Sequence, residues 1–292
     1  MDQAEQLRNI VKLQNQRTTG NARVITVTSG KGGVGKSNVS VNLAVQLQKI
    51  GKKVIIFDAD FGLANVEVMI GAIPKYNLSD LIYNGKNIQE IITDGPEGMG
   101  FISGGSGIVG LSNLTRDQIA FFIHNLSYLD NIADVILIDT GAGIADSVLE
   151  FALASPEIIL VTTPEPSSLT DSYSLLKALH RNPNFNQQET VIKVLSNKVN
   201  SVEDGNLVYE KLVSVVTKFL NGKIDYLGMI PMDPFIDKAI RQQKPVSLCY
   251  PNAKSSKAFK TIADSLASDK HAQIQMKKGI TQLFSNFLNK RN

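Results

Sequence analysis

The segment Gly30-Lys31-Gly32-Gly33-Val34-Gly35-Lys36-Ser37 carries the most specific chemical pattern in this sequence. It is a complete phosphate-loop pattern, in which Gly-Lys-Ser follows a first glycine after four intervening residues. The apolar run at residues 24–29 predicts a buried strand before it, and residues 39–50 predict a helix after it. Glycines let backbone N–H groups turn toward phosphate oxygens, and the helix N-terminus adds its positive end. The segment therefore predicts a nucleoside triphosphate site rather than a glycine turn without a ligand.

The residue types of the loop also predict individual roles. Lys36 should reach the β- and γ-phosphates, and the Ser37 hydroxyl should bind Mg²⁺. The residues predicted to surround the nucleotide are Gly30, Lys31, Gly32, Gly33, Val34, Gly35, Lys36, Ser37 and Asn38.

The composition is that of an ordinary globular protein. The chain has 292 residues, of which 43% are hydrophobic and 20% are charged. No apolar run reaches the length of about 18 residues that predicts a transmembrane helix, and the polar N-terminus lacks the pattern of a secretory signal. The single cysteine, Cys249, excludes an intrachain disulfide and a cysteine-based metal cluster within one chain. These features predict a cytoplasmic location and argue against iron–sulfur reductases that share this loop.

The net charge of +3 is distributed unevenly along the chain. Residues 1–23 are basic overall, and residues 270–292 contain lysines and an arginine but no acidic side chain. The remaining body, residues 24–269, is mildly acidic. This distribution predicts that partners bind at the tails.

Short apolar runs alternate with helical patterns along most of the chain. Further strands are predicted at residues 53–58, 99–103, 135–139, 158–162, 191–196 and 226–230. Further helices are predicted at residues 117–126, 147–154, 168–180, 203–220 and 234–243. The alternation predicts an α/β fold whose parallel sheet has helices on both faces and whose ligands lie beyond the carboxyl ends of the strands. The predicted organisation is an N-terminal segment 1–23, a domain 24–267 and a C-terminal segment 268–292.

Lys31 is a second lysine directly after the first glycine, which an ordinary phosphate loop does not need. The loop with this lysine resembles the deviant Walker A loop of the MinD/ParA family of P-loop NTPases. The resemblance implies an ATPase in which Lys31 and Lys36 are catalytic and Lys31 reaches the phosphates on the partner subunit of a homodimer. ATP would then hold the dimer together. A solvated loop lysine is the alternative.

Two strand ends carry carboxylates of interest. Asp58-Ala59-Asp60 can orient water near a γ-phosphate, although acidic strand ends are often only solvated caps. This segment is similar to switch I of MinD-like proteins, which implies that Asp60 is catalytic and positions the attacking water. Asp139 ends the run at residues 135–139 and suits a Walker B carboxylate that holds Mg²⁺ through water. Its segment resembles switch II, although Gly141 stands where most members have proline.

Two later strand ends are candidates for base recognition. The amide of Asn197 can pair with both the acceptor and the donor edge of adenine. The resemblance implies that Asn197 and the loop containing Pro231 hold the base, although Met232 replaces the more usual acidic residue. Guanine recognition would be signalled by Asn-Lys-x-Asp, and no Asp follows Asn197-Lys198-Val199 at that position, so ATP is predicted.

The C-terminal segment contains an apolar stripe at helical spacing, formed by Ile280, Leu283, Phe284, Phe287 and Leu288. Basic residues at 277, 278, 290 and 291 flank it. The pattern fits a helix at residues 277–291 that lies on an anionic membrane surface, as in MinD-like ATPases, and that binds more tightly in a dimer. The alternative is a terminal helix that docks on the protein core.

The N-terminal segment begins Asp2-Gln3-Ala4-Glu5-Gln6-Leu7-Arg8 and predicts a helix that forms on a partner. With the two nucleotide motifs, it resembles the FlhG (YlxH/FleN) family of MinD-like regulators of flagellar number. The resemblance implies that residues 1–20 stimulate an FlhF-type GTPase, that the protein acts at the inner face of the cell membrane when ATP is bound, and that flagellar basal-body proteins are further partners. A disordered terminus is the alternative.

Three other readings compete with this one. MinD-type placement of the division site differs chiefly in residues 1–20. A ParA-like DNA-partitioning ATPase would need a basic surface for phosphate backbones, so no specific nucleic acid is expected for this acidic body. A slow scaffold that uses ATP only for structure is the third, and Asp60 argues against it.

Overall fold

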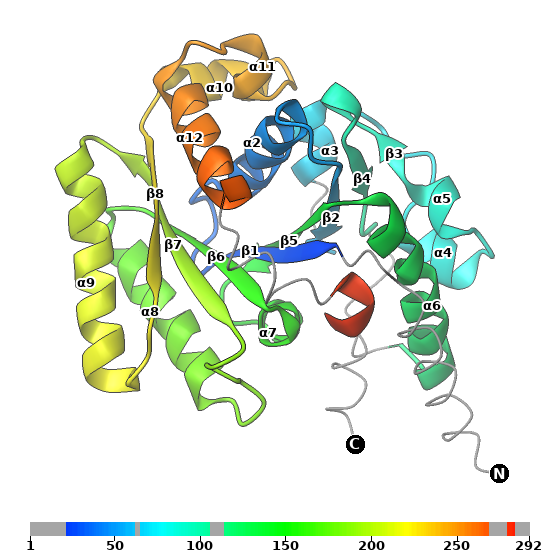
Figure 1. Ribbon diagram of the computed structural model, residues 1–292, viewed down its shortest axis with the longest axis horizontal. Coiled ribbons are helices and arrows are strands. Elements are labelled where there is room, and N and C mark those ends of the chain that lie inside the picture. Colours follow the sequence, from blue (N-terminus) through cyan, green and yellow to red (C-terminus); the bar gives the residue numbers. More distant parts are fainter. Residues whose placement is uncertain (1–21, 62–64, 106–113, 269–278, 284–292) are drawn as a thin grey trace.

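The computed structural model of the chain describes residues 22–61, 65–105, 114–268 and 279–283. Within these residues the sheet has eight strands in the order β3-β4-β2-β5-β1-β6-β7-β8 (Figure 1). All neighbouring strands run parallel except the short edge pair β3–β4. The structure therefore confirms the predicted α/β fold, with one antiparallel edge strand added.

The strands are β1 (Arg23–Ser29), β2 (Val54–Ala59), β3 (Thr93–Asp94), β4 (Gly100–Ile102), β5 (Val135–Ala142), β6 (Glu157–Thr162), β7 (Val191–Val199) and β8 (Asp225–Pro231). The helices are α2 (Lys36–Lys49), α3 (Asn65–Ile70), α4 (Leu78–Tyr83), α5 (Ile88–Ile91), α6 (Arg116–Ile132), α7 (Asp146–Ala154), α8 (Pro166–Arg181), α9 (Val202–Leu220), α10 (Pro234–Arg241), α11 (Val246–Cys249) and α12 (Lys254–Ser268), with a 3₁₀ turn at Pro96–Gly98.

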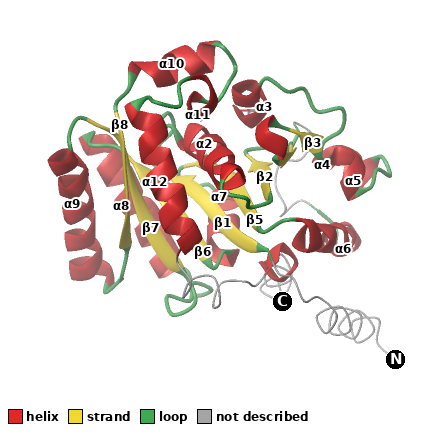
Figure 2. Cartoon of the chain, turned by 45° about the horizontal axis from the view of Figure 1, so that its top comes forward, coloured by secondary structure: helices red, strands yellow, loops and turns green. Residues whose placement is uncertain are grey.

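The central strands are buried on both faces, which explains their continuous apolar sequences. Side chains alternate along a strand, so successive residues enter different cores. In β2, Ile56 packs into one core while Ile55 and Phe57 pack into the opposite one. Helices α2 and α12 cover the first face, and α6, α7, α8 and α9 cover the other (Figure 2). This arrangement leaves the carboxyl ends of the strands open for the loops that carry the predicted site.

The predicted elements are present, and their ends differ by a few residues. The helix expected at residues 39–50 already begins at Lys36, and the strand expected at residues 191–196 continues to Val199. The sequence interpretation missed α12, although Phe259, Ile262, Ala263 and Leu266 have helical spacing and all are buried against α2 and the sheet. The short elements between β2 and β4 were also missed, because so few residues show no clear period.

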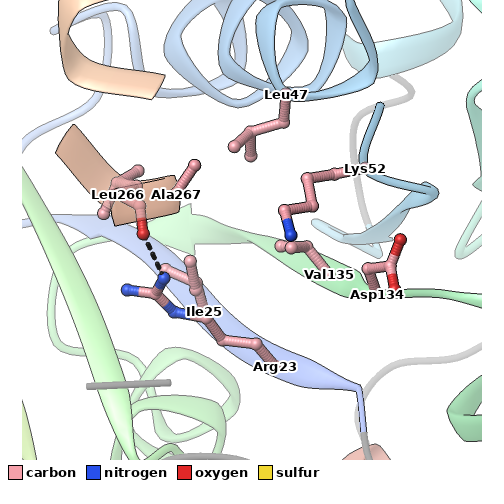
Figure 3. Close-up of a pocket in the computed structure, with 8 residues that line it drawn as sticks. All are labelled: Arg23, Ile25, Leu47, Lys52, Asp134, Val135, Leu266 and Ala267. Carbon is pink, nitrogen blue, oxygen red and sulfur yellow. Dashed lines mark hydrogen bonds between the residues drawn. The ribbon is translucent and has the colours of Figure 1, made fainter. Parts of the chain in front are cut away.

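A buried charge cluster ties together the amino ends of the central strands, opposite the phosphate loop. Glu157 accepts hydrogen bonds from Arg23 at 2.7 and 2.8 Å and pairs with the Lys193 ammonium at 2.9 Å. Arg23 also donates to the carbonyl of Leu266 in α12, across a small pocket shown in Figure 3. The pocket lies at the start of β1, so it is remote from the nucleotide motifs.

Residues 279–283 form a helical turn that docks on the core beside α6. Ile280 and Leu283 are buried in the same core as Phe122 and Leu126. The Asp130 carboxylate accepts hydrogen bonds from the Ile280 and Thr281 amides, and from the Thr281 hydroxyl at 2.6 Å. Burial raises the pKa of Asp130 despite these bonds. The start of the predicted tail helix is therefore docked in this structure, and the rest of residues 277–291 lies outside the described residues.

None of the helices in the described ranges is long and apolar enough to cross a membrane.

We expect Glu157→Gln to destabilise the fold strongly. The substitution leaves two buried cations without the carboxylate that they share, which typically costs about 3 to 5 kcal/mol in the free energy of unfolding. Urea denaturation would measure the change. Lys260→Met is the control, because its pair with Asp264 is exposed and should contribute less than about 1 kcal/mol. Similar losses in both variants would contradict the structural role of the cluster.

Candidate functional site

The phosphate loop connects the carboxyl end of β1 to the first turn of α2. Gly33 and Gly35 adopt φ values of 78° and 93°, a left-handed region that glycine enters without strain. Gly35 is the N-cap of α2, and the first turn of this helix carries no acidic side chain. Because its N–H groups lack partners within the helix, this end can receive an anion. The backbone thus has the form that a phosphate-binding loop requires.

Lys36 and Asp139 form a buried ion pair at the centre of the site. The Lys36 ammonium lies 3.2 Å from Asp139 Oδ1, which also accepts a hydrogen bond from the Ser40 hydroxyl at 2.9 Å. The second oxygen, Asp139 Oδ2, is buried and has no hydrogen-bond partner among the described residues. An orphaned carboxylate oxygen next to the first turn of α2, which contains Ser37, fits the donor set expected for Mg²⁺ and its water.

Asp58 adds a second buried carboxylate beside this pair. It lies directly opposite Asp139 in the register of β2 and β5. Burial, followed by the charge of Asp139, raises the pKa of Asp58 well above its ordinary value. Asp58 accepts hydrogen bonds from the amides of Asp60 and Val66, so it anchors both sides of the switch I segment. Because ionisation of Asp58 is disfavoured beside Asp139, a bound divalent cation would stabilise its charged form.

Asp60 lies at the rim of this carboxylate pair. Its side chain is half-buried beside Gly141 of β5, and Asn65 donates to Asp60 Oδ2 at 3.4 Å. The structure therefore brings Asp60 to the same end of the sheet as Lys36 and Asp139. The role of Asp60 in orienting water stays a prediction.

Lys31 lies at the exposed edge of the loop and contacts its own chain. Its ammonium is 2.8 Å from both Glu165 Oε2 and the Ser167 hydroxyl, at the start of α8. The hydrogen bond and charge of Lys31 lower the pKa of Glu165. The two side chains are 35% and 61% exposed, so water screens the pair. Lys31 is therefore neither a fully solvated lysine nor a buried one.

Asn197 lies against the other side of the loop, and Pro231 lies on the neighbouring strand β8. The Asn197 amide donates to the Val34 carbonyl at 2.7 Å, while its Oδ1 is buried without a partner among the described residues. That oxygen can accept a hydrogen bond from a donor such as the adenine amine. Pro231 ends β8 opposite Val199, next to Asn197, and Met232 beyond it is 62% exposed. The two predicted base residues are thus neighbours, and their contact with the base stays a prediction.

Several residues of the site were missed at the level of sequence. Ser40 is one helical turn after Lys36, a spacing that places both on the same face of α2. Glu165 follows the end of β6 and Lys198 lies near the end of β7, but their contacts with Lys31 and with the Gly33 carbonyl depend on tertiary structure. The helical spacing was a usable signal for Ser40, whereas no local signal pointed to the other two.

Comparisons with known proteins agree with this geometry. The model of the ParA family, described as the NUBPL iron-transfer P-loop NTPases, matches residues 21–267. The antiactivator FleN of Pseudomonas aeruginosa is 40% identical over 84% of this chain and 86% of FleN. The flagellum site-determining protein YlxH of Helicobacter pylori is 33% identical over 98% of each chain.

Among solved structures, the septum site-determining protein MinD of Pyrococcus horikoshii, in complex with Mg-ADP, superposes with a TM-score of 0.66. It is 25% identical, over 87% of this chain and 98% of that chain. The chain therefore belongs to the ParA family of P-loop NTPases, as an ATPase of its MinD-like FlhG group, to which FleN and YlxH are related.

Proposed function

We propose that this protein is an ATP-dependent dimerisation switch that regulates the number or placement of flagella at the inner face of the cell membrane. The observation that carries the proposal is a buried ion pair of the phosphate loop, Lys36 with Asp139, beside an exposed contact between Lys31 and Glu165. The flagellar part rests on the names of the two relatives, an antiactivator and a flagellum site-determining protein.

ATP and Mg²⁺ are the proposed ligands of the central site. Lys36 would neutralise charge on the β- and γ-phosphates, while Ser37 and, through water, Asp139 would hold Mg²⁺. Asp60 would orient the attacking water, helped by the hydrogen bond from Asn65. The single cysteine, Cys249, gives no basis for proposing an iron–sulfur carrier role from the name of the family model.

Dimerisation through Lys31 is supported by the weakness of its present contact. An exposed ion pair between a lysine and a glutamate contributes roughly 0.2 to 1 kcal/mol, so little free energy opposes its opening. Phosphate oxygens of a nucleotide on a partner subunit would provide more negative charge than Glu165 does. Lys31 can therefore leave Glu165 when ATP brings two copies together, which makes assembly depend on the bound nucleotide.

Membrane binding through residues 277–291 would compete with the docking seen at residues 279–283. Ile280 and Leu283 belong to the predicted apolar stripe, and both are buried on the core. Insertion of the stripe into an anionic bilayer requires these side chains to leave the core and the bonds to Asp130 to open. Two tails in a dimer would offset that cost better than one.

Residues 1–20 are the proposed contact with an FlhF-type GTPase, and they lie outside the described residues. Division-site placement, as in MinD, is the alternative function for the same fold.

We expect Lys31→Ala to abolish ATP-induced dimerisation while most nucleotide binding remains, because Lys31 is not part of the buried centre. Lys36→Ala should instead weaken nucleotide binding itself. Analytical ultracentrifugation with ATP and nucleotide titration would separate the two effects. Lys223→Ala, at an exposed lysine far from the loop, is the control. A Lys31→Ala protein that sediments as a dimer with ATP would refute the proposal.

We expect Asp130→Asn to increase binding to anionic vesicles without ATP, because the tail loses part of its anchor on α6. Thr281→Val should have a smaller effect in the same direction, since it removes one hydrogen bond, worth about 1 kcal/mol. Phe284→Glu should reduce binding by placing a charge in the stripe. Vesicle sedimentation measures all three, with Asp134→Asn as the control, because Asp134 caps the Lys53 amide instead. Unchanged binding by the Asp130 and Phe284 variants would support permanent docking.

We expect a peptide of residues 1–20 to stimulate GTP hydrolysis by an FlhF-type GTPase without the ATPase domain. Leu7 supplies the apolar anchor, so Leu7→Asp should reduce both binding and stimulation. Gln3→Ala should reduce stimulation more than binding, because its amide can orient water. Turnover of GTP is measured with each peptide at saturation. Binding without stimulation, or no binding, would favour division-site placement.

A further inference from the structure

The end of β7 has an unusual backbone that turns two consecutive side chains toward the phosphate loop. The register of β7 against β8 shifts between Asn197 and Val199, and Lys198 has a φ of 56°. A left-handed conformation is unfavourable for a residue with a long side chain. In a regular strand, neighbouring side chains point to opposite faces. The kink at Lys198 removes that alternation at this position.

As a result, β7 holds two successive carbonyls of the loop. The Asn197 amide donates to the Val34 carbonyl at 2.7 Å, and the Lys198 ammonium donates to the Gly33 carbonyl at 2.9 Å. The packing is close, because a Cβ on Gly35 would lie 2.5 Å from Asn197 Nδ2. Asn197 is buried in this contact and Lys198 is exposed.

These two contacts orient N–H groups as well as carbonyls. In a planar trans peptide, the C=O and the following N–H point in opposite directions. A Gly33 carbonyl held toward β7 therefore directs the Val34 N–H away from β7. In the same way, a Val34 carbonyl held by Asn197 directs the Gly35 N–H away from β7. Phosphate binding by such a loop depends on backbone N–H groups that converge on the anion.

We propose that Lys198 is a positioning residue of the ATPase site, which holds the Gly33–Val34 peptide in its phosphate-binding orientation before the nucleotide arrives. Asn197 supports the next peptide in the same way. The inference rests on the phosphate loop and the ATPase assignment, and it is independent of dimerisation, the membrane and the flagellar role. It also gives a reason for the strained backbone at Lys198, since a regular strand would direct this ammonium away from Asn197 and the loop.

The Lys198 ammonium also acts on Glu165, and this second effect needs a control. The charge of Lys198 contributes, after Lys31, to the lowered pKa of Glu165. Lys198 therefore lies near the Lys31–Glu165 pair, and its removal changes the surroundings of that glutamate as well. Glu165→Gln removes the charge of Glu165 and leaves the Gly33 contact in place, so it isolates this route.

The decisive experiment compares Lys198→Asn with Lys198→Arg. Asparagine tolerates a left-handed φ, but its side chain is too short to contact the Gly33 carbonyl as the lysine ammonium does. Arginine keeps both the positive charge and the hydrogen-bond donors. Hydrogen–deuterium exchange of the nucleotide-free protein reports on the Val34 and Gly35 amides. Titration calorimetry gives the Kd of ADP and of a non-hydrolysable ATP analogue, and steady-state assays give KM and kcat.

For Lys198→Asn we expect faster exchange at these two amides and a three- to tenfold higher Kd for both nucleotides, roughly the loss of one exposed charged hydrogen bond. KM should rise more than kcat falls, because the weakened phosphate contacts are made equally in the ground state and in the transition state. Lys198→Arg should restore the wild-type values, and Glu165→Gln should leave the exchange rates unchanged.

Two results would overturn the proposal. Unchanged exchange together with unchanged Kd would show that Lys198 does not hold the loop. A raised Kd with unchanged exchange in the nucleotide-free protein would show direct contact with the nucleotide instead of positioning. The thermal unfolding midpoint of Lys198→Asn without nucleotide should match that of the wild type, because the side chain is exposed.

Discussion

The ion pair between Lys36 and Asp139 is the constraint on which the site depends. Both groups are buried, and removing an ion pair from water costs more than the attraction between the charges returns unless further hydrogen bonds complete it. Ser40 supplies one such bond, while one oxygen of Asp139 is left over. Asp58, directly opposite, adds another carboxylate whose ionisation is disfavoured. A divalent cation and nucleotide phosphates would balance the buried charges of Lys36, Asp139 and Asp58. Ligand binding and the stability of the site are therefore linked.

The strand order explains how residues so far apart in the sequence meet. β1 lies between β5 and β6, so the loop after β1 stands where the connections diverge to opposite faces of the sheet. β5 brings Asp139 to one side of the loop, and β7 brings Asn197 and Lys198 to the other. α2 can be buried along almost its whole length because α12 covers it from outside. The buried residues of the site are thus held in place by central elements of the fold, namely β1, β5, β7 and α2.

The sequence predicted the parts of this architecture that depend on local pattern. The phosphate loop, the apolar strands and the carboxylate at residue 139 are each set by neighbours a few residues away, and the structure places them as expected. The contact of Lys31 with Glu165 joins residues 134 positions apart and could not be read from either segment. The left-handed backbone at Lys198 could not be predicted from the sequence either, because a lysine does not indicate this conformation. The docking of Ile280 was an open alternative, since an apolar stripe fits a core and a membrane equally well.

The contacts of the described site fall into two groups, a buried group that resists change and an exposed group that can exchange partners. A switch requires both kinds of contact. Lys36, Asp139 and Asp58 are buried, so any rearrangement there leaves a charge without a partner and is strongly opposed. Lys31 is more exposed, and its contact with Glu165 can be exchanged for phosphate or water at little cost. The tail is held more firmly, because Ile280 and Leu283 are buried and the buried Asp130 carboxylate holds the backbone and hydroxyl of its first turn. The Lys31 contact can therefore open while the buried Lys36–Asp139 pair stays in place.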